Sequence, residues 1–291
     1  MKGLILVNAY TRSDHELNQP RRIREELAGL GVPCDLRRND FVPAYYDGYD
    51  GGVRSRVGAY DFCVYLDKDK YASRLLEKAG LRLFNRAEAV EICDDKMLTH
   101  IALADAVPMP PTVAGPLCYT DGAPVSEELL SQVEQLLGLP VVVKESYGSL
   151  GKGVYLAHNR TELQKIAERV RNKPHLFQRY IAESSGTDLR VIVIGGKAIA
   201  AMRRISQGDF RSNAELGGRG EAAALDERTA QLCERVAQTI GLDYCGVDLL
   251  LSKDGPLVCE VNSNAFFGTF ERVTNVNVAK IYAEHIVRTM K

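Results

Sequence analysis

The sequence predicts a mixed α/β and α+β protein, built from several structural units around a cleft. Three observations support this class. The chain has 291 residues, which is longer than one typical domain. Over the first ~90 residues, short apolar runs alternate with polar stretches of helical spacing. Farther on, blocks of strands are separated by helices, as in units that combine helices with antiparallel sheets.

Residues 1–90 are expected to form an N-terminal α/β unit. The pattern predicts buried parallel strands at residues 4–7 and 62–66 and helices at residues 21–30 and 71–79. Gly31 and Gly80 follow the two helices and suit helix C-caps.

Residues 91–176 make up the predicted central unit. A helical pattern of about two dozen residues starts near Asn85, with a break near Asp94, and stops at the proline-rich run VPMPPTV. From Pro140 the order is strand, glycine-rich loop, strand and helix.

Residues 177–291 make up the predicted C-terminal unit. They are rich in β patterns and contain an amphipathic helix at residues 226–240, opened by Asp226 as N-cap. A last helix is expected near residues 276–290.

Composition excludes several classes of function. The formal net charge is -1, so no basic field attracts nucleic acid or an anionic membrane, and neither is expected as a partner. The first apolar run reads as a strand rather than a secretion signal, and no apolar stretch reaches the roughly 20 residues that span a bilayer. The 7 cysteines are scattered without a C-x-x-C pair, which indicates reduced core residues of a cytoplasmic protein.

Three oxygen-bearing side chains stand inside apolar strands near the C-terminus. Glu260 and Asn262 are two positions apart in LVCEVNSN, so both project to one face of a strand, and Asp248 in GVDLLLS can join them from a neighbour. Such an all-oxygen set suits magnesium held partly by substrate phosphates. The alternative is a structural network in which the two carboxylates pair with Arg203 or Arg204.

A lysine and a glycine-rich loop form a second candidate site. Lys144 ends the apolar run VVVKE, and Gly148, Gly151 and Gly153 follow, so a cation and backbone amides can meet phosphate oxygens. The loop precedes a strand and does not match the Walker A pattern, which makes it a flap. An exposed turn is the alternative.

Cationic side chains accumulate in the next region. Arg190, Arg203, Arg204 and Arg211 suit planar recognition of phosphate and carboxylate groups, with a solvated basic face as the alternative. Lys96, near a helix start, is a weaker candidate.

Taken in order, these motifs resemble the ATP-grasp superfamily, within it the RimK-type glutamate ligases. The resemblance runs from about Glu91 to the C-terminus and is most specific in DLRVIVIGGKAIAAMRRISQGDFRSN, GLDYCGVDLLLS and GPLVCEVNSN. It implies an ATP-grasp fold with an N-terminal Rossmann-like α/β domain, a small central lid domain and a C-terminal domain.

The resemblance also implies roles for individual residues. The nucleotide would be bound by Lys96, Lys144, Ser149, Gly151, Gly153, Arg179, Tyr180, Asp188, Arg211, Ser212 and Asn213. Mg²⁺, or Mn²⁺ in its place, would be bound by Asp248, Glu260 and Asn262. Arg204 would lie beside the acyl phosphate, and Arg190 would bind a substrate carboxylate.

The sequence departs from the family pattern at three places. Arg179 stands where relatives commonly have an acid, and Glu145 replaces the proline after the lysine. Ala265, Phe266 and Phe267 stand where the better-known glutamate ligases have a proline-glycine turn, so glutamate is not assumed to be the added amino acid.

The expected function is an ATP-dependent carboxylate-amine ligase that forms an amide or peptide bond through an acyl phosphate. Its partners would be ATP, a carboxylate and an amine, the latter an amino acid, a peptide or a protein tail. The alternatives are a small-molecule kinase of related fold and a catalytically silent nucleotide-binding protein. The number of subunits stays open, with a homo-oligomer as one option.

Overall fold

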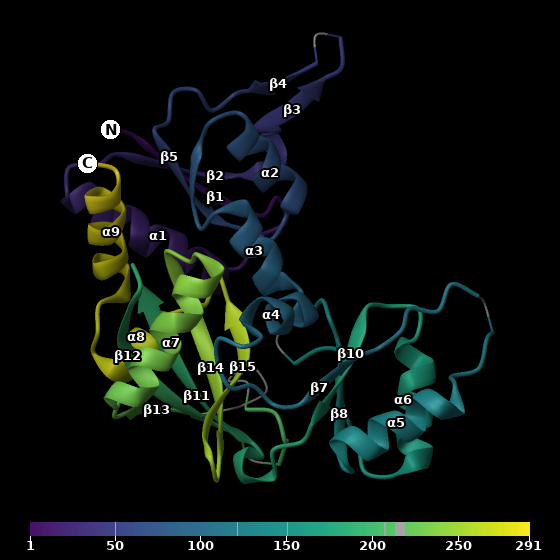
Figure 1. Cartoon of the computed structure of the whole chain (residues 1–291). Helices are drawn as coiled ribbons and strands as arrows, with labels where there is room; N and C mark the ends of the chain where they lie inside the picture. Colours follow the sequence, from purple (N-terminus) through teal and green to yellow (C-terminus); the bar gives the residue numbers. More distant parts are fainter. Residues whose placement is uncertain (50, 121, 150, 207, 213–218) are drawn as a thin grey trace.

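The computed structural model describes residues 1–49, 51–120, 122–149, 151–206, 208–212 and 219–291. Within these residues the chain forms three main sheets, each with its own helices, and one projecting hairpin (Figure 1). None of the helices that the structure describes combines the length and apolar character that crossing a bilayer requires.

The first sheet is parallel, with the strand order β2-β1-β5-β6. Its strands are β1 (Gly3–Val7), β2 (Cys34–Arg38), β5 (Phe62–Leu66) and β6 (Arg82–Phe84). The two predicted buried strands are therefore confirmed. The strand order reverses between β1 and β5, and the carboxyl ends of parallel strands border a crevice at such a point.

Helices and a hairpin complete the N-terminal unit. They are α1 (Asp14–Gly29), the 3₁₀ turn η1 (Asn39–Phe41), α2 (Lys70–Lys78), and the hairpin of β3 (Ala44–Asp47) and β4 (Gly52–Ser55). α1 begins before its predicted start because Ser13 and Glu16 form a capping box, in which each side chain accepts from the backbone amide of the other.

Two short helices replace the predicted long one. α3 (Ala87–Asp94) and α4 (Lys96–Leu103) meet at Asp95, whose side chain accepts hydrogen bonds from the backbone amides of Met97 and Leu98. The break expected near Asp94 is confirmed. Both helices pack against the third sheet.

The second sheet is antiparallel, with the order β7-β10-β8-β9. Its elements are β7 (Thr112–Ala114), α5 (Glu127–Leu137), β8 (Val141–Glu145), β9 (Val154–Ala157), α6 (Arg160–Val170) and β10 (His175–Arg179). The helices and the sheet enclose a core of their own, whose buried residues all lie between Val125 and Phe177, with Val113 of β7 packed against them. The predicted domain boundaries after residues 90 and 176 stay a prediction. The first falls inside helix α3 and the second inside strand β10.

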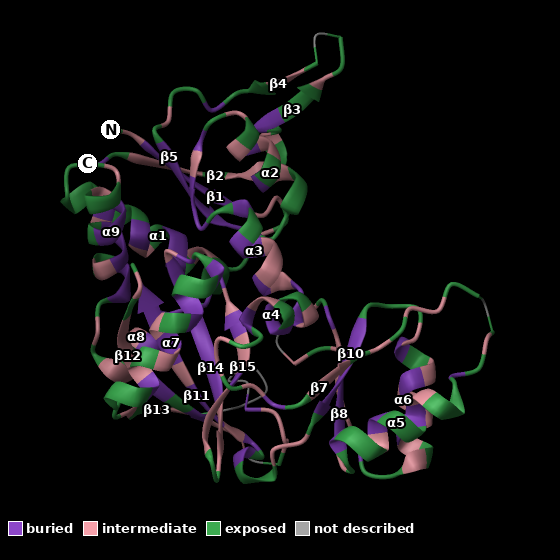
Figure 2. Ribbon diagram, viewed as in Figure 1, coloured by how far each residue is buried: buried purple, intermediate pink, exposed green. Residues whose placement is uncertain are grey.

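The third sheet is antiparallel, with the order β13-β12-β11-β14-β15. Its elements are η2 (Ala182–Ser184), β11 (Thr187–Ile194), β12 (Lys197–Ile205), β13 (Arg219–Ala223), α7 (Glu227–Ile240), β14 (Tyr244–Ser252), β15 (Gly255–Asn262), α8 (Gly268–Thr274) and α9 (Val278–Thr289). Its central strands are buried (Figure 2).

Successive side chains of β11 point to opposite faces of the third sheet, and the two faces pack in different cores. Val191 and Val193 pack in a core with α7, whereas Ile192 and Ile194 pack on the opposite face. The face with the isoleucines shares one core with β1, β5, α1 and α9. Arg190 continues that face beyond the core, so the sheet changes from apolar to charged along one strand.

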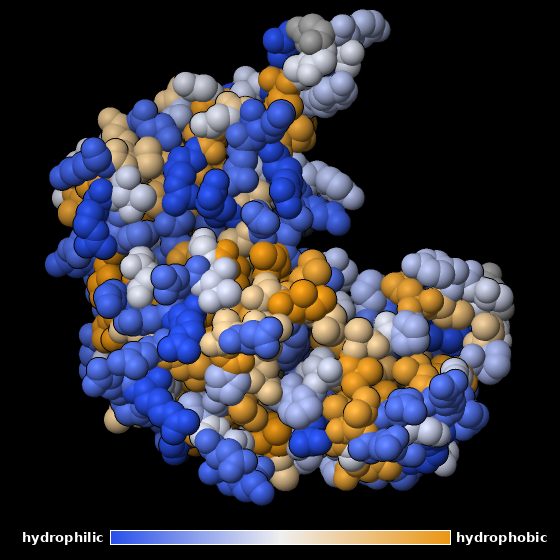
Figure 3. Space-filling model, in the orientation of Figure 1, coloured by the Kyte–Doolittle hydropathy of each residue, from blue (hydrophilic) through white to orange (hydrophobic). Residues whose placement is uncertain are grey.

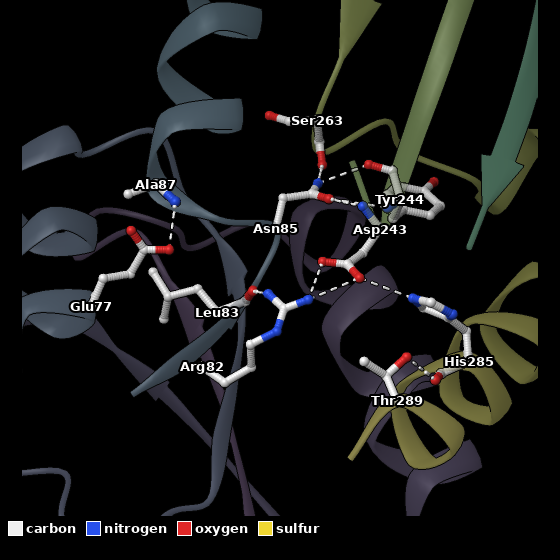
Figure 4. A network of polar contacts seen from close by, with 10 residues as sticks. All are labelled: Glu77, Arg82, Leu83, Asn85, Ala87, Asp243, Tyr244, Ser263, His285 and Thr289. Carbon is white, nitrogen blue, oxygen red and sulfur yellow. Dashed lines mark hydrogen bonds and ion pairs between the residues drawn. The ribbon is translucent and has the colours of Figure 1, made fainter. Parts of the chain in front are cut away.

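A polar network also joins the N-terminal unit to the third sheet (Figure 4). The Asn85 side chain donates to the backbone oxygens of Tyr244 and Ser263, at 2.7 and 2.8 Å. Its oxygen accepts from the backbone amides of Asp243 and Tyr244. Arg82 forms an ion pair with Asp243 at 2.8 Å. These contacts fix the end of β15 to the N-terminal unit.

Candidate functional site

A group of charged side chains occupies the polar half of the third sheet. The register sets Asp248 opposite both Glu260 and Arg190, and Asn262 opposite Gly246. Directly opposed residues project to the same face of an antiparallel sheet. Asp248, Glu260 and Asn262 therefore share one face, as the alternation in the sequence predicts.

Asp248 is bound by two arginines. Arg190 Nε and Nη2 donate to its two oxygens, both at 2.7 Å, and Arg204 Nη2 lies 2.9 Å from Oδ2. Burial alone would raise the pKa of Asp248, but the two arginines outweigh it and lower that pKa. The sequence allowed an alternative in which the carboxylates pair with Arg203 or Arg204. Asp248 does form an ion pair with Arg204, whereas Arg203 lies opposite Leu189, on the other face of the sheet.

Glu260 and Asn262 form fewer polar contacts than Asp248 does. Within the residues that the structure describes, Glu260 forms no ion pair, and Asn262 Nδ2 donates to Asp248 Oδ2 at 3.3 Å. No group of three His, Cys, Asp or Glu gathers there among those residues. The side chains on this face whose oxygens could hold a metal ion are Asp248, Glu260 and Asn262.

Asp188 lies on β11, on the same face of the third sheet as Asp248, and is paired opposite Arg204 of β12. Arg204 and the Ser212 hydroxyl both donate to its carboxylate. Asp188 and Arg204 are 6% and 4% exposed, so the two charges compensate each other in a nearly dry environment.

The inner cavity lies between the second and third sheets. Its wall contains most of the residues expected to bind nucleotide: Lys96, Lys144, Ser149, Gly151, Arg179, Tyr180, Asp188, Arg211 and Ser212. Arg204, Asp248 and Glu260 line it as well. Sequence reasoning thus gathered residues from four separate segments that the fold brings to one place.

Two buried lysines approach the inner cavity. Lys96 Nζ donates to the backbone oxygen of Gly148 at 2.9 Å, and Lys144 Nζ donates to Cys259 Sγ at 3.4 Å. Burial lowers the pKa of Lys96, while Glu260 opposes that shift. Both ammonium groups hold weak or backbone partners, so an anion in the cavity can attract them.

The glycine-rich loop lies beside these lysines. Arg211 Nη1 donates to the Gly151 backbone oxygen at 2.8 Å, which ties the loop to the segment after β12. Gly153 is absent from the cavity wall, but its backbone oxygen accepts from the Glu145 amide at 2.8 Å and closes the loop on β8. Asn213, also expected at the nucleotide, lies outside the described residues.

The far end of the inner cavity is formed by the end of β10. The Tyr180 ring meets Phe210 edge-on with centroids 6.4 Å apart, while the Arg179 guanidinium turns to the backbone oxygens of Leu136 and Leu137 at the end of α5. Gln178 also lines the cavity, and no pattern in the sequence indicated it. Its amide lies 3.0 Å from the ring of buried His100.

The outer cavity adjoins the inner one and has a volume of about 680 Å³. Ser149, Arg204 and Glu260 line both. Arg190 and Asn262 lie on its C-terminal side. The two spaces therefore meet at the charged group on the third sheet, and the outer one is in the size range of small-molecule sites.

The N-terminal unit forms the opposite side of the outer cavity, which sequence reasoning missed. Asn8 and Asp67 stand directly after β1 and β5, at the crevice between these strands. Asn8 Nδ2 donates to Asp67 at 3.2 Å. Their position one residue past two buried strands is a signal that could have identified them.

Comparison with known proteins supplies independent findings. The family model described as RimK-like ATP-grasp domain matches residues 93–286. N-acetylaspartylglutamate synthase A from Homo sapiens is 40% identical over 223 residues, 75% of this chain and 56% of its own length. The chain thus spans little more than half of that relative. A probable alpha-L-glutamate ligase from Xanthomonas euvesicatoria pv. vesicatoria is 37% identical over 252 residues, 84% of this chain and 80% of its own.

Among solved structures, the ATP-grasp ligase PsnB complexed with a phosphomimetic variant of its minimal precursor, Mg and ADP is similar in fold. The TM-score is 0.70 over 99% of this chain and 98% of that chain, with 19% sequence identity. The similarity extends over the N-terminal unit, which the family model leaves out.

Proposed function

The chain belongs to the RimK-like ATP-grasp family and has the ATP-grasp fold, and from that premise we propose that it is an ATP-dependent carboxylate-amine ligase. It would activate a carboxylate as an acyl phosphate and pass the acyl group to an amine. The names of the relatives, two of them glutamate-adding enzymes, support this reaction type.

The observation that carries the proposal is the junction of the two cavities. A nucleotide in the inner cavity and a carboxylate in the outer cavity would meet at Arg204 and Glu260, which line both. Two anions can react only where positive charge offsets their repulsion. Lys96, Lys144 and Arg204 supply that charge from three different elements.

The oxygen set on the third sheet fits a magnesium ion. Asp248, Glu260 and Asn262 share a face, and two carboxylates with one amide oxygen are the hard oxygen ligands that would hold magnesium there. Bound magnesium would neutralise charge on the transferring phosphoryl group. Arg190, which donates to Asp248, would bind a substrate carboxylate in the outer cavity that it lines.

The reaction then proceeds in two steps. A carboxylate oxygen attacks the γ-phosphorus and ADP leaves, which gives the acyl phosphate. The amine nitrogen attacks the carbonyl carbon, the bond from that carbon to the phosphate oxygen breaks, inorganic phosphate leaves and the nitrogen loses a proton. Lys144 and Arg204 would hold the phosphoryl oxygens, and the loop that Arg211 ties down would keep water from the acyl phosphate.

The test is an ADP-release assay with ATP and magnesium over a panel of carboxylates and amines, with mass spectrometry of the products. Lys144→Ala and Glu260→Ala should abolish amine-dependent ADP release. Lys197→Ala is the matched control, because Lys197 is an exposed lysine on the turn side of β12. Unaltered turnover in both site variants would refute the proposal.

Product analysis also separates the ligase from a kinase of related fold. A ligase yields ADP, free phosphate and a new amide, whereas a kinase leaves the phosphate on its product. Tight ATP binding with no ADP formation across the panel would instead indicate a silent nucleotide-binding protein.

A further inference from the structure

Gln19 is a buried polar residue in the apolar stripe of α1. Ile23 and Leu27 follow it at intervals of one helical turn and lie in the shared core. Gln19 itself is 2% exposed. Its Nε2 donates to Asn264 Oδ1 at 3.1 Å, but its Oε1 is buried and has no hydrogen-bond partner among the described residues. A buried oxygen that has lost its hydrogen bonds to water without a replacement destabilises the fold, so this one requires an explanation.

The location of Gln19 supplies that explanation. Gln19 and Asn264 both line the outer cavity, and Asn264 lies two residues beyond Asn262. The contact between them joins α1 of the N-terminal unit to the loop after β15. Close by, the His15 ring packs against Phe266 with centroids 5.4 Å apart. The loop that departs from the glutamate-ligase pattern is therefore held by α1.

The two sides of the outer cavity differ in hydrogen-bonding character. The C-terminal side presents Arg190 and Arg204, which suit carboxylate and phosphate oxygens. On the N-terminal side, Glu16 and Asp67 already accept hydrogen bonds from Ser13 and Asn8, and Lys68 is paired with Asp94 at 2.7 Å. The Gln19 oxygen is an acceptor there that has no partner among the described residues. A carboxylate is therefore favoured on the C-terminal side and a hydrogen-bond donor on the N-terminal side.

On the basis of the proposed ligase function, we infer that Gln19 binds the amine substrate, with its Oε1 accepting a hydrogen bond from the substrate N–H. The ligand class is the primary amine of an amino acid or of a peptide N-terminus, which binds as the ammonium and releases one proton to solvent before its nitrogen attacks. Selectivity for the amine thus resides in the N-terminal unit, outside the residues 93–286 that match the family model.

Two substitutions separate this role from a merely structural one. Gln19→Leu removes the acceptor, and Gln19→Glu keeps it while removing the donor to Asn264. The substrates are ATP, a mixture of N-acetyl L-amino acids that can act only as carboxylates, and the twenty standard L-amino acids tested singly as amines. For the best amine, Gln19→Leu should raise KM by about tenfold or more, the value of a lost hydrogen bond to a charged donor. Gln19→Glu should retain a KM near the wild-type value.

Carboxylate activation serves as the internal control. Hydroxylamine, which needs no amine-binding site at high concentration, should trap equal amounts of acyl phosphate as hydroxamate in all three proteins, with an unchanged KM for ATP. Gln238→Leu makes the same change at an exposed position on α7 and should leave every parameter unchanged.

Equal increases in KM for the amine in Gln19→Leu and Gln19→Glu would overturn the inference, because they would mean that only the contact with Asn264 matters. An unchanged KM in Gln19→Leu would overturn it too. Failure of the ligase proposal is distinguishable, since wild type would then release no ADP with any pair. In that case, calorimetric titration of each amino acid decides the inference. Weaker binding to Gln19→Leu supports it, and equal binding or no binding to wild type overturns it.

Discussion

At the scale of single residues, Asp248 and Glu260 differ although both are expected to bind the same metal. Asp248 is 3% exposed and holds two arginines, whereas Glu260 forms no ion pair among the described residues. Removing one partner of a buried ion pair is costly because it leaves the other charge uncompensated, whereas Glu260 is only half-buried and retains contact with water. The two carboxylates should therefore be separable by stability even where both are needed for turnover.

Neutralising Asp248 should destabilise the protein far more than neutralising Glu260. Asp248→Asn leaves Arg190 without a carboxylate and Arg204 with Asp188 alone, so the free energy of unfolding should fall by about 3 kcal/mol. Glu260→Gln should change it by less than about 0.5 kcal/mol. Urea denaturation without nucleotide or metal measures both. Equal losses of stability would show that the arginines do not depend on Asp248.

At the scale of elements, the loop between β8 and β9 depends on a left-handed backbone. Gly153 has a φ of +73°, and an added Cβ would lie 3.0 Å from the side chain of Glu145, the last residue of β8. Lys144 precedes that residue. The conformation of the loop and the position of the lysine are therefore coupled.

Gly153→Ala should impair nucleotide binding rather than only stability. The strained φ costs about 1 kcal/mol, and the displaced Glu145 should shift Lys144 and raise the KM for ATP several-fold. Gly196→Ala is the control, because Gly196 has a φ of +75° in open space, in the turn between β11 and β12. It should show a similar loss of stability with an unchanged KM. A higher KM for ATP in both variants would mean that reduced stability, rather than the position of Lys144, causes the effect.

Local pattern accounts for the elements that could be predicted. The fold class, the buried strands at residues 4–7 and 62–66 and the break near Asp94 were confirmed, because strand periodicity and capping residues act over a few neighbours. The predicted start of α1 at residue 21 was wrong because the capping box of Ser13 and Glu16 extends the helix past Pro20. The shared face of Asp248, Glu260 and Asn262 also follows from periodicity.

What could not be predicted depends on packing between distant segments. Nothing near Asp248 in the sequence indicates that Arg190, 58 positions away, donates to it. Gln19 reads as one polar position in an amphipathic helix until α1 docks against the loop at Asn264, 245 positions away. The side of the site that carries Asp248, Glu260 and Asn262 was thus visible in the sequence, and the N-terminal side was not.

At the scale of the whole molecule, the three sheets are joined unequally. The first and third sheets share one apolar core and the Asn85 network, so they form a single body (Figure 4). The second sheet keeps a separate core, and the space-filling view shows a hollow between it and the N-terminal unit (Figure 3). Near the inner cavity the contacts from this unit to the third sheet are hydrogen bonds, such as Arg211 to Gly151 and Lys144 to Cys259, rather than a shared apolar core. Hinge closure requires such an arrangement.

Nucleotide should therefore close the second sheet onto the other two. A compact chain of this length has a radius of gyration of about 19 Å, and small-angle X-ray scattering should give a larger value for the free protein that falls on adding magnesium and a non-hydrolysable ATP analogue. The cause is the new attraction of Lys144, on the second sheet, and Arg204, on the third, to the same phosphates. Lys144→Ala should reduce the change under identical conditions, and Lys197→Ala should not. An identical radius with and without the analogue at saturating concentration would mean that the cavity binds its ligand without closure.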